Sequence, residues 1–448
     1  MSIAQLKRSL GFWDVFFIAV GQIIGAGVIA LTGIAIGMTG PGVVLAYLAS
    51  AVLVIVVTLL IMMAGASLPV VGAYYAWSAR LGGGWLGSLV LWLTLLASIS
   101  LSLYGSSFGL YLEPVFGLLD ANQWGIVVVT LLCIGNLFGL TLASGVQRLL
   151  VFVLLSALAL YAGFAAPNID AAKLSPMLPS GWLGFLTAVF LLKFATSGAY
   201  MVVGLGSEIR NPHRVIPIVM TTATLFVAVL YAGVAAASVG VVDWREMIDQ
   251  PLTVAGEVFM PGWALTYFLL AGAGLAICTT LNAQFIQLPR TFMLASWDGL
   301  LPAWIGRLNR YGAPHVILLA MLAVGIVPLV ANLEIGEIAR VASIAANLPP
   351  LIVYWVVLRI PETHPQQYQR SGFRFSKRTL WTLFVISEGA TLAGIYLLAR
   401  DLPISVILTV VVWVGLAIAY YPLRRAYLAR QGINLDAQVT DAAIFKGQ

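Results

Sequence analysis

The sequence predicts an all-α membrane protein with about twelve transmembrane helices, and three observations indicate this class. Of its 448 residues, 61% are hydrophobic and only 9% are charged, whereas soluble domains carry about 25% charged residues. Apolar runs of roughly 20 residues, long enough to cross a hydrocarbon core of ~30 Å, recur from end to end. Because these runs are continuously apolar and do not alternate, they favour helices over a β-barrel.

The expected spans are the apolar runs between loop signals, with boundaries good to several residues. In the first half of the chain they cover residues 13–37, 42–66, 85–112, 123–142, 149–166 and 182–207. In the second half they cover residues 215–241, 262–288, 314–331, 338–358, 379–399 and 402–422. We expect residues 1–428 to form one transmembrane domain and residues 429–448 to form a short, polar, frayed cytoplasmic tail.

Positive charges indicate the orientation of these spans. If the N-terminus is cytoplasmic, eighteen Lys and Arg residues fall in inside segments and only four, Lys173, Arg245, Arg340 and Arg400, in outside segments. The positive-inside rule demands such a bias. An even number of spans then places both termini in the cytoplasm, in a multi-pass protein of the cell membrane. The cations are scattered over short loops, which argues against a nucleic-acid partner.

The first apolar run is expected to stay in the mature protein, because no small-residue cleavage site follows it. Cys133 and Cys278 both fall inside apolar runs. We interpret them as small hydrophobic residues without a disulfide or a functional role. The three histidines lie in predicted loops and show no metal-ligand spacing, so we expect no metal and no cofactor. They are His213, His315 and His364.

Other classes of membrane protein find less support in the sequence. An intramembrane enzyme would need a nucleophile-base pair or a metal cluster, and neither an H-E-x-x-H nor a G-x-S-x-G pattern occurs. An ATP-driven pump would need a phosphate-binding loop and a soluble domain. We therefore expect no enzymatic activity. A channel or a non-transporting sensor stays an alternative, because broken helices also line the filters of channels.

The first span contains a candidate break near its centre, at Gly25-Ala26-Gly27. Each glycine weakens helix propensity by about 1 kcal/mol. Backbone groups freed by an unwound turn are tolerated in a membrane only where they line a cavity. The functional interpretation is that amides of Gly25, Ala26 and Gly27, at the N-terminus of a second half-helix, bind a substrate carboxylate. The alternative is close helix packing through small-residue pairs such as Gly21 and Gly25.

The sixth span contains a second candidate break. Residues 193–200 place a lysine, two hydroxyls and a glycine in the middle of the membrane. Interrupted segments at corresponding positions in two halves of a chain indicate a transporter site. The two breaks lie five spans apart, as a five-plus-five inverted repeat predicts. The sequence therefore predicts that helices one and six are broken around one site.

Four motifs carry a resemblance to a known family. They are Gly25-Ala26-Gly27, the Gly-Ala-Tyr-Tyr-Ala-Trp run at 72–77, Ser-Glu-Ile-Arg-Asn-Pro-His-Arg-Val-Ile-Pro at 207–217, and Asp-Gly-Leu-Leu-Pro at 298–302. In order and spacing they resemble the amino acid-polyamine-organocation (APC) superfamily over most of the chain, and least beyond span ten. Within that superfamily the chain is similar to the arginine-agmatine antiporter branch.

The resemblance implies a twelve-span fold with two intertwined inverted repeats of five helices. The repeats would cover about residues 13–166 and 182–358, and two peripheral helices would cover about 379–422. The resemblance also implies alternating access at a site between spans one, three, six, eight and ten.

The resemblance implies roles for individual residues as well. The substrate carboxylate would meet the glycine motif of span one. Its amino group would meet main-chain carbonyls, which carry over here to Ile23, Phe194 and Ser197. Phe194 also matches the aromatic residue that gates the site.

Three departures from the branch bear on the substrate. Ala26 stands where the branch has a serine, so one hydroxyl contact to the carboxylate is lost. Tyr200 stands where cation-handling relatives keep an acidic residue. This argues against arginine, lysine or a polyamine, because a buried cationic side chain would lack a counter-charge. Some proton-coupled or exchanging relatives hold a lysine in span five. Residues 146–161 here contain only Arg148 as a cation, close to the cytoplasmic end, so the usual lysine is absent.

Lys193 in the sixth span costs roughly 2.5 to 3.5 kcal/mol at mid-membrane. We interpret it as a coupling or gating residue that exchanges a proton during the cycle or holds an acidic group of the substrate. The alternative is that it snorkels or pairs with a carbonyl or with Glu388. Glu208 is expected at a cytoplasmic gate, with Arg80 or Arg210 as partner, or else as an ordinary solvated charge.

Span eight offers further polar candidates. Asn282 and Gln284 would reach the site if they lie on the correct face, or would only join helices. Thr279 and Thr280 would supply oxygens to a sodium ion beside the first span, or would only pack helices.

These residues together predict a secondary active transporter for a small neutral or hydrophobic amino acid, with proton coupling or exchange. The runner-up is an exporter or exchanger of a charged amino acid or amine. The expected partners are the amino acid and the lipid bilayer, and the sequence leaves a homodimer open.

Overall fold

The computed structural model describes residues 8–25, 27–331, 335–399 and 404–440 of the chain. Helices dominate this part of the protein, and no β-strand occurs within it. Among the described residues, nine helical stretches are long and apolar enough to cross a membrane. Three shorter apolar helices accompany them: Phe12–Ile23, Ala121–Leu137 and His315–Val330. The all-α membrane class is therefore confirmed, while twelve crossings stay a prediction.

Every predicted span contains one or more of the observed helices. The first half of the chain forms α1 (Phe12–Ile23), α2 (Gly27–Thr39), α3 (Val43–Ser67), α4 (Ala73–Gly82), α5 (Gly84–Ala97), α6 (Ser100–Phe116), α7 (Ala121–Leu137), α8 (Leu140–Ala165) and α9 (Gly181–Thr196). The second half forms the 3-10 helix η5 (Ala199–Gly204), α10 (Pro212–Val241), α11 (Leu252–Phe259), α12 (Gly262–Tyr267), the π-helix η6 (Phe268–Gly274) and α13 (Leu275–Trp297). It continues with α14 (His315–Val330), α15 (Ile335–Val357), α16 (Ile360–Thr363), α17 (Pro365–Arg370), α18 (Lys377–Ala399), α19 (Ile404–Ala429) and α20 (Leu435–Val439).

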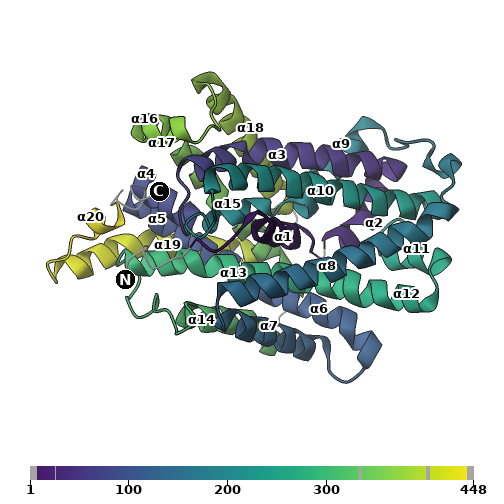
Figure 1. Ribbon diagram of the computed structural model, residues 1–448, viewed down its shortest axis with the longest axis horizontal. Helices are drawn as coiled ribbons and strands as arrows, with labels where there is room; N and C mark the ends of the chain where they lie inside the picture. Colours follow the sequence, from purple (N-terminus) through teal and green to yellow (C-terminus); the bar gives the residue numbers. More distant parts are fainter. Residues whose placement is uncertain (1–7, 26, 332–334, 400–403, 441–448) are drawn as a thin grey trace.

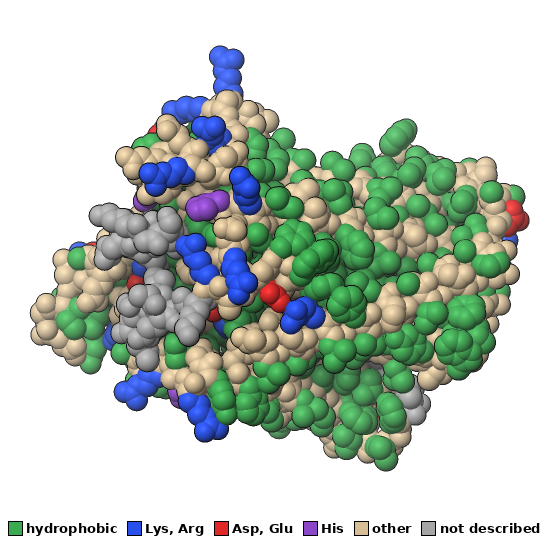
Figure 2. Space-filling model, in the orientation of Figure 1, with side chains coloured by type: hydrophobic (Ala, Val, Ile, Leu, Met, Phe, Trp, Pro, Cys, Tyr) green, Lys and Arg blue, Asp and Glu red, His purple; other side chains and the backbone are tan. Residues whose placement is uncertain are grey.

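The long helices run side by side along the longest axis of the molecule (Figure 1). Helix α4 and the last described helix, α20, both lie at one end of this bundle. We call it the termini end. Figure 2 shows that Lys and Arg side chains gather there, whereas hydrophobic side chains cover the flanks. A bundle with apolar flanks and charged ends suits a protein that is surrounded by lipid.

Small residues let neighbouring helices approach closely. A Cβ atom on Gly109 of α6 would lie 1.7 Å from the carbonyl oxygen of Ala121 in α7. A Cβ atom on Gly21 of α1 would lie 1.9 Å from Nε2 of Gln147 in α8. Gly21 therefore serves close helix packing, as the alternative interpretation of the span-one glycines expects. The same span also contains the break described below.

One predicted loop is wrong. The apolar runs place a loop at residues 143–148, but α7 ends at Leu137 and α8 already begins at Leu140. The turn between them is made by Gly139, whose φ of +96° is a conformation that glycine adopts without strain. A two-residue turn, Phe138 and Gly139, inside an apolar stretch leaves almost no polar signal in the sequence, which explains the error.

The expectation of a frayed tail is wrong for residues 435–439. They form α20, in which Leu435 and Val439 are 1% and 0% exposed. The Tyr421 hydroxyl donates to Oδ1 of Asp436 at 2.5 Å, and Nε of Arg425 lies 2.7 Å from its Oδ2. Two apolar anchors and one bonded carboxylate therefore hold the tail helix against α19 and the bundle.

Candidate functional site

The first break interrupts span one at the predicted place. Helix α1 ends at Ile23 and α2 begins at Gly27, with Ile24 in an extended conformation (ψ 95°). Carbonyl groups in the last turn of a helix lack partners within that helix. Ala26 lies outside the described residues. The carboxylate-binding role of the amides at Gly25, Ala26 and Gly27 stays a prediction.

The second break interrupts span six, again at the predicted place. Helix α9 ends at Thr196, and η5 starts after Ser197 and Gly198. Gly198 has a φ of +146°, and a Cβ atom on it would lie 2.8 Å from the carbonyl oxygen of Gln22. It would also lie 3.1 Å from Cα of Ile23. The two breaks therefore touch, as a single site between spans one and six requires.

Two threonines of α13 bind the carbonyls that the first break frees. The Thr279 hydroxyl donates to the carbonyl oxygen of Ile24 at 3.2 Å. The Thr280 hydroxyl lies 3.2 Å from the Gly21 carbonyl oxygen and 3.3 Å from that of Ile24. Both hydroxyls also contact the carbonyl of Ala276, at 2.7 and 3.2 Å. Oxygens from two helices therefore converge beside the first break, and sodium binding by Thr279 and Thr280 stays a prediction.

A buried amide network lies next to these threonines. Nδ2 of Asn282 donates to Oε1 of Gln147 at 2.8 Å, and Nδ2 of Asn136 donates to Oδ1 of Asn282 at 2.8 Å. Nε2 of Gln147 donates to the carbonyl oxygen of Thr279 at 3.1 Å. Asn282 thus joins α13 to α7 and α8 in this structure. Its predicted contact with substrate stays a prediction.

Neutral polar groups occur in η5, which follows the second break, and in the helices α6 and α13. Oε1 of Gln284 in α13 accepts a hydrogen bond from the Ser100 hydroxyl of α6 at 3.1 Å. The Tyr200 ring in η5 stacks on that of Tyr74, with centroids 6.0 Å apart. Three phenols from α4, α6 and α15 lie close enough to Tyr200 to interact with it electrostatically: Tyr74, Tyr104 and Tyr354. The region therefore offers amides, hydroxyls and phenols.

The last turn of α9 carries two further predicted site residues. Lys193 is half-buried and forms no ion pair within the described part of the chain. Its carbonyl oxygen accepts a hydrogen bond from the Ser197 hydroxyl at 2.7 Å. Phe194 is 51% exposed. The carboxylate of Glu388, the alternative partner of Lys193, instead lies near Tyr354. The coupling role of Lys193 and the gating role of Phe194 stay predictions.

Two buried ion pairs lie at the termini end. Arg80 of α4 binds Asp298 through two hydrogen bonds of 2.7 Å, and their side chains are 2% and 9% exposed. Arg290 of α13 binds Glu208 at 3.2 and 3.4 Å, with exposures of 8% and 6%. The expectation that Glu208 pairs with Arg80 or Arg210 is therefore wrong. The alternative, that Glu208 is an ordinary solvated charge, is wrong as well, because its side chain is buried. Arg80 forms its ion pair with Asp298 instead.

Main-chain hydrogen bonds tie distant segments together at the same end. The amide of Leu10 donates to the carbonyl of Glu208 at 3.0 Å, and the amide of Arg210 donates to the carbonyl of Leu10 at 2.8 Å. The amide of Gly72 donates to the carbonyl of Gly204 at 2.9 Å. The segments before α1, before α4 and after η5 thus meet beside the two ion pairs. In this structure the termini end is closed.

The Arg80 guanidinium of the first pair keeps its charge. Helix α4 lies outside the stretches long enough to span a membrane. Burial lowers the pKa of the Arg80 guanidinium, but the hydrogen bonds and the charge of Asp298 raise it by more, so the pKa lies above its ordinary value. The Tyr75 ring, 5.9 Å from the guanidinium, covers the pair. The guanidinium therefore stays positively charged beside Asp298.

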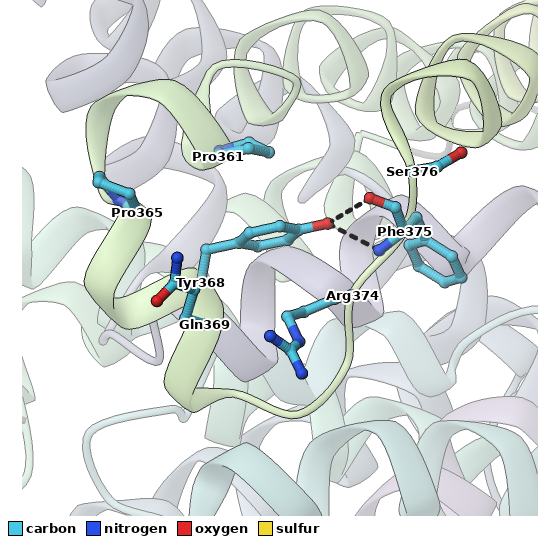
Figure 3. Close-up of a pocket in the computed structure, with 7 residues that line it drawn as sticks. All are labelled: Pro361, Pro365, Tyr368, Gln369, Arg374, Phe375 and Ser376. Carbon is cyan, nitrogen blue, oxygen red and sulfur yellow. Dashed lines mark hydrogen bonds between the residues drawn. The ribbon is translucent and has the colours of Figure 1, made fainter.

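A hollow of about 620 Å³ lies elsewhere, in the connection between α16 and α18 (Figure 3). The Tyr368 hydroxyl fixes this connection, because it donates to the Phe375 carbonyl at 2.9 Å and accepts from the Phe375 amide at 2.7 Å. None of its lining residues belongs to the breaks. They are Pro361, Pro365, Tyr368, Gln369, Arg374, Phe375 and Ser376.

Sequence reasoning missed several of these groups. Gln147 is fully buried in an apolar helix, and its polarity alone could have marked it. Oε1 of Gln22 is buried without a hydrogen-bond partner in the described part of the chain. The backbone carbonyl of the same residue lies next to Gly198, so Gln22 offers a further candidate acceptor. Asp298 and Arg290 bind partners 218 and 82 residues away, which no local pattern could reveal.

Replacing Gly198 with alanine tests the contact between the breaks. The new Cβ would meet the backbone of Gln22 and would adopt a strained φ, so we expect a loss of roughly 1 to 3 kcal/mol of stability. The midpoint of thermal denaturation of the purified protein measures it. Gly204→Ala is the control, because its Cβ meets no atom within 4 Å. Equal midpoints for the two variants would contradict the contact.

Replacing Asp298 with asparagine tests the closing pair. The change leaves the buried Arg80 charge without a counter-charge, and breaking a buried pair in this way costs about 3 to 5 kcal/mol. Asp243→Asn is the control, since the Asp243–Arg245 pair is exposed (47% and 65%) and surface pairs contribute about 0 to 1 kcal/mol. The midpoint of thermal denaturation should fall clearly in Asp298→Asn and hardly in Asp243→Asn. Equal midpoints would mean that the Arg80–Asp298 pair does not stabilise this end of the protein.

Comparison with known proteins places this geometry in a family. The sequence profile of the family described as "Amino acid permease" matches residues 10–429. An uncharacterized transporter of Mycobacterium tuberculosis is 27% identical over 449 residues, covering 97% of this chain and 96% of the relative. The branched-chain amino acid permease BcaP of Bacillus subtilis is 24% identical over 336 residues, 70% of this chain and 72% of the relative. The vacuolar cationic amino acid transporter 4 of Arabidopsis thaliana is 27% identical over 394 residues, 80% and 64%.

The match covers nearly the whole chain, and the relatives are transporters and not enzymes. The expected membership in the APC superfamily is confirmed, whereas the arginine-agmatine antiporter branch stays a prediction. The chain belongs to the amino acid permease family and is a multi-pass membrane protein that transports amino acids.

Proposed function

We propose that this protein is a secondary active transporter that moves a small neutral or hydrophobic amino acid across the cell membrane by alternating access. One observation carries the proposal: the breaks in spans one and six touch at Gln22 and Gly198. Main-chain donors and acceptors of two half-helices therefore meet in one place. Such groups can bind the carboxylate and the ammonium group of one zwitterion together.

Within this proposal the amides of Gly25, Ala26 and Gly27 bind the carboxylate, at the start of α2. The carbonyls of Ile23, Phe194 and Ser197 bind the ammonium group. The Phe194 ring then covers the bound substrate as a gate. The two breaks belong to two inverted repeats of five helices, and closure of the termini end by buried ion pairs supports alternating access.

The substrate side chain would lie among neutral groups. Tyr200 follows the second break and stacks on the phenol ring of Tyr74. The amide of Gln284 in α13 adds a further neutral polar group. A cationic side chain in this region would need a carboxylate beside it. We therefore favour a neutral side chain, and the name of the branched-chain permease of Bacillus subtilis agrees with this choice.

A specific observation supports the runner-up, an exchanger of a charged amino acid or amine. The Glu388 carboxylate of α18 lies near Tyr354, which itself neighbours Tyr200. It could supply the missing counter-charge, and one relative is named a cationic amino acid transporter. A channel finds less support, because the matching family is one of permeases and the named relatives are transporters.

The basic termini end would face the cytoplasm, in accordance with the positive-inside rule (Figure 2). Lys193 would couple transport to protons or take part in exchange. A charged side chain without an ion pair inside a membrane span raises the free energy of the protein, so its presence suggests a function in transport.

A thermal-shift screen of the purified protein against amino acids and amines tests the substrate class. A ligand at 100 times its Kd stabilises the folded state by about 2.7 kcal/mol. We expect leucine, valine or alanine to raise the midpoint, and arginine, lysine and agmatine not to. Tyr200→Glu should gain a response to the cationic ligands, whereas Tyr200→Phe should not. No response to any amino acid or amine would contradict the proposal.

Uptake into proteoliposomes under an imposed pH gradient tests the coupling role of Lys193. Lys193→Met keeps the length of the side chain and removes its charge, so the stimulation of uptake by the gradient should disappear. Lys377→Met is the control, because Lys377 is 81% exposed and pairs with Glu362 outside the site. Unchanged stimulation in Lys193→Met would exclude a coupling role for this residue.

A further inference from the structure

Gln287 of α13 carries a buried amide group without a partner. Its side chain is 3% exposed, and neither its Nε2 nor its Oε1 has a hydrogen-bond partner within the described part of the chain. Buried polar side chains are nearly always hydrogen-bonded, because a buried group without a partner loses its bonds to water without replacement. An amide with both ends unpaired therefore requires an explanation.

The position of Gln287 connects it to transport. It follows Gln284 by three residues and precedes Arg290 by three residues, and side chains three residues apart in a helix lie on neighbouring parts of one face. With a rise of 1.5 Å per residue, each step along α13 is about 4.5 Å. Gln287 therefore lies one turn from the Gln284–Ser100 contact and one turn from the Arg290–Glu208 pair.

Two other amides of the same bundle are satisfied. Gln147 and Asn282 are similarly buried, yet each takes part in at least two hydrogen bonds with neighbouring helices. The fold is therefore able to satisfy a buried amide. Gln287, by contrast, has both ends of its amide unpaired within the described residues, and it lies on α13 between Thr280 at the first break and Arg290 at the closed end.

We propose that Gln287 is a further residue of the transport pathway, whose amide gains hydrogen bonds only when the termini end opens. Opening separates Arg290 from Glu208 and gives the amide access to water and to the polar groups of the permeating amino acid. In the closed state the unpaired amide raises the free energy, so Gln287 shifts the equilibrium toward opening. This inference rests on the alternating access proposed above.

Hydrogen exchange of the substrate-free protein tests the inference. The amide protons of Leu10, Gly72 and Arg210 bridge separate segments at the closed end, and they exchange when that end opens. Gln287→Met replaces the amide by an apolar side chain of similar volume. We expect these protons to exchange about ten-fold more slowly in the variant, which corresponds to about 1.4 kcal/mol.

Gln147→Met is the matched control. It removes hydrogen bonds that exist in the closed state, so the same protons should exchange faster or the midpoint of thermal denaturation should fall. Unchanged or faster exchange in Gln287→Met would overturn the inference. Misfolding of both Gln287→Met and Gln287→Leu would overturn it as well, because an unpaired amide has no hydrogen bond to lose. The measurement contains no amino acid, so it can fail while the substrate assignment holds.

Discussion

The fold depends on one constraint: main-chain groups inside a membrane must find partners within the protein. Two interrupted helices would leave such groups exposed to lipid if they stood alone. Here the interruptions lie against each other at Gly198, and hydroxyls of α13 bind the carbonyls of Gly21 and Ile24. Helices α7 and α8 then hold α13 in place through their amides. The unwound backbone is thus possible because a third element, α13, forms hydrogen bonds with its carbonyl groups.

Closure of the termini end uses a different interaction. Two arginines, from α4 and α13, bind two carboxylates that come from other segments, and all four side chains are buried. Main-chain bonds between residues before α1, before α4 and after η5 complete the contact. The same helix α13 therefore supports the first break at Thr280 and closes the end at Arg290. A movement of α13 would therefore act on both places.

Much of this could be predicted from the sequence, for physical reasons. Apolar runs long enough to cross a membrane determine the class, and the glycines near 25 and 198 indicate the breaks, because helix propensity falls there. The turn at Gly139 could not be predicted, since it leaves almost no polar signal in an apolar stretch. The docking of α20 could not be predicted either, because it depends on contacts across the fold, such as that between Gln438 and Gly299. The same holds for the partner of Glu208: several arginines were available, and only the packed structure selects Arg290.

The burial of the Arg80–Asp298 pair has a consequence for the environment in which the protein works. Dissolved salt weakens contacts between exposed charges but has far less effect on charges shielded by protein. With side chains only 2% and 9% exposed, this pair keeps its strength when ionic strength rises or falls. The contact that this pair makes between α4 and the end of α13 therefore depends little on the salt concentration of the surrounding solution.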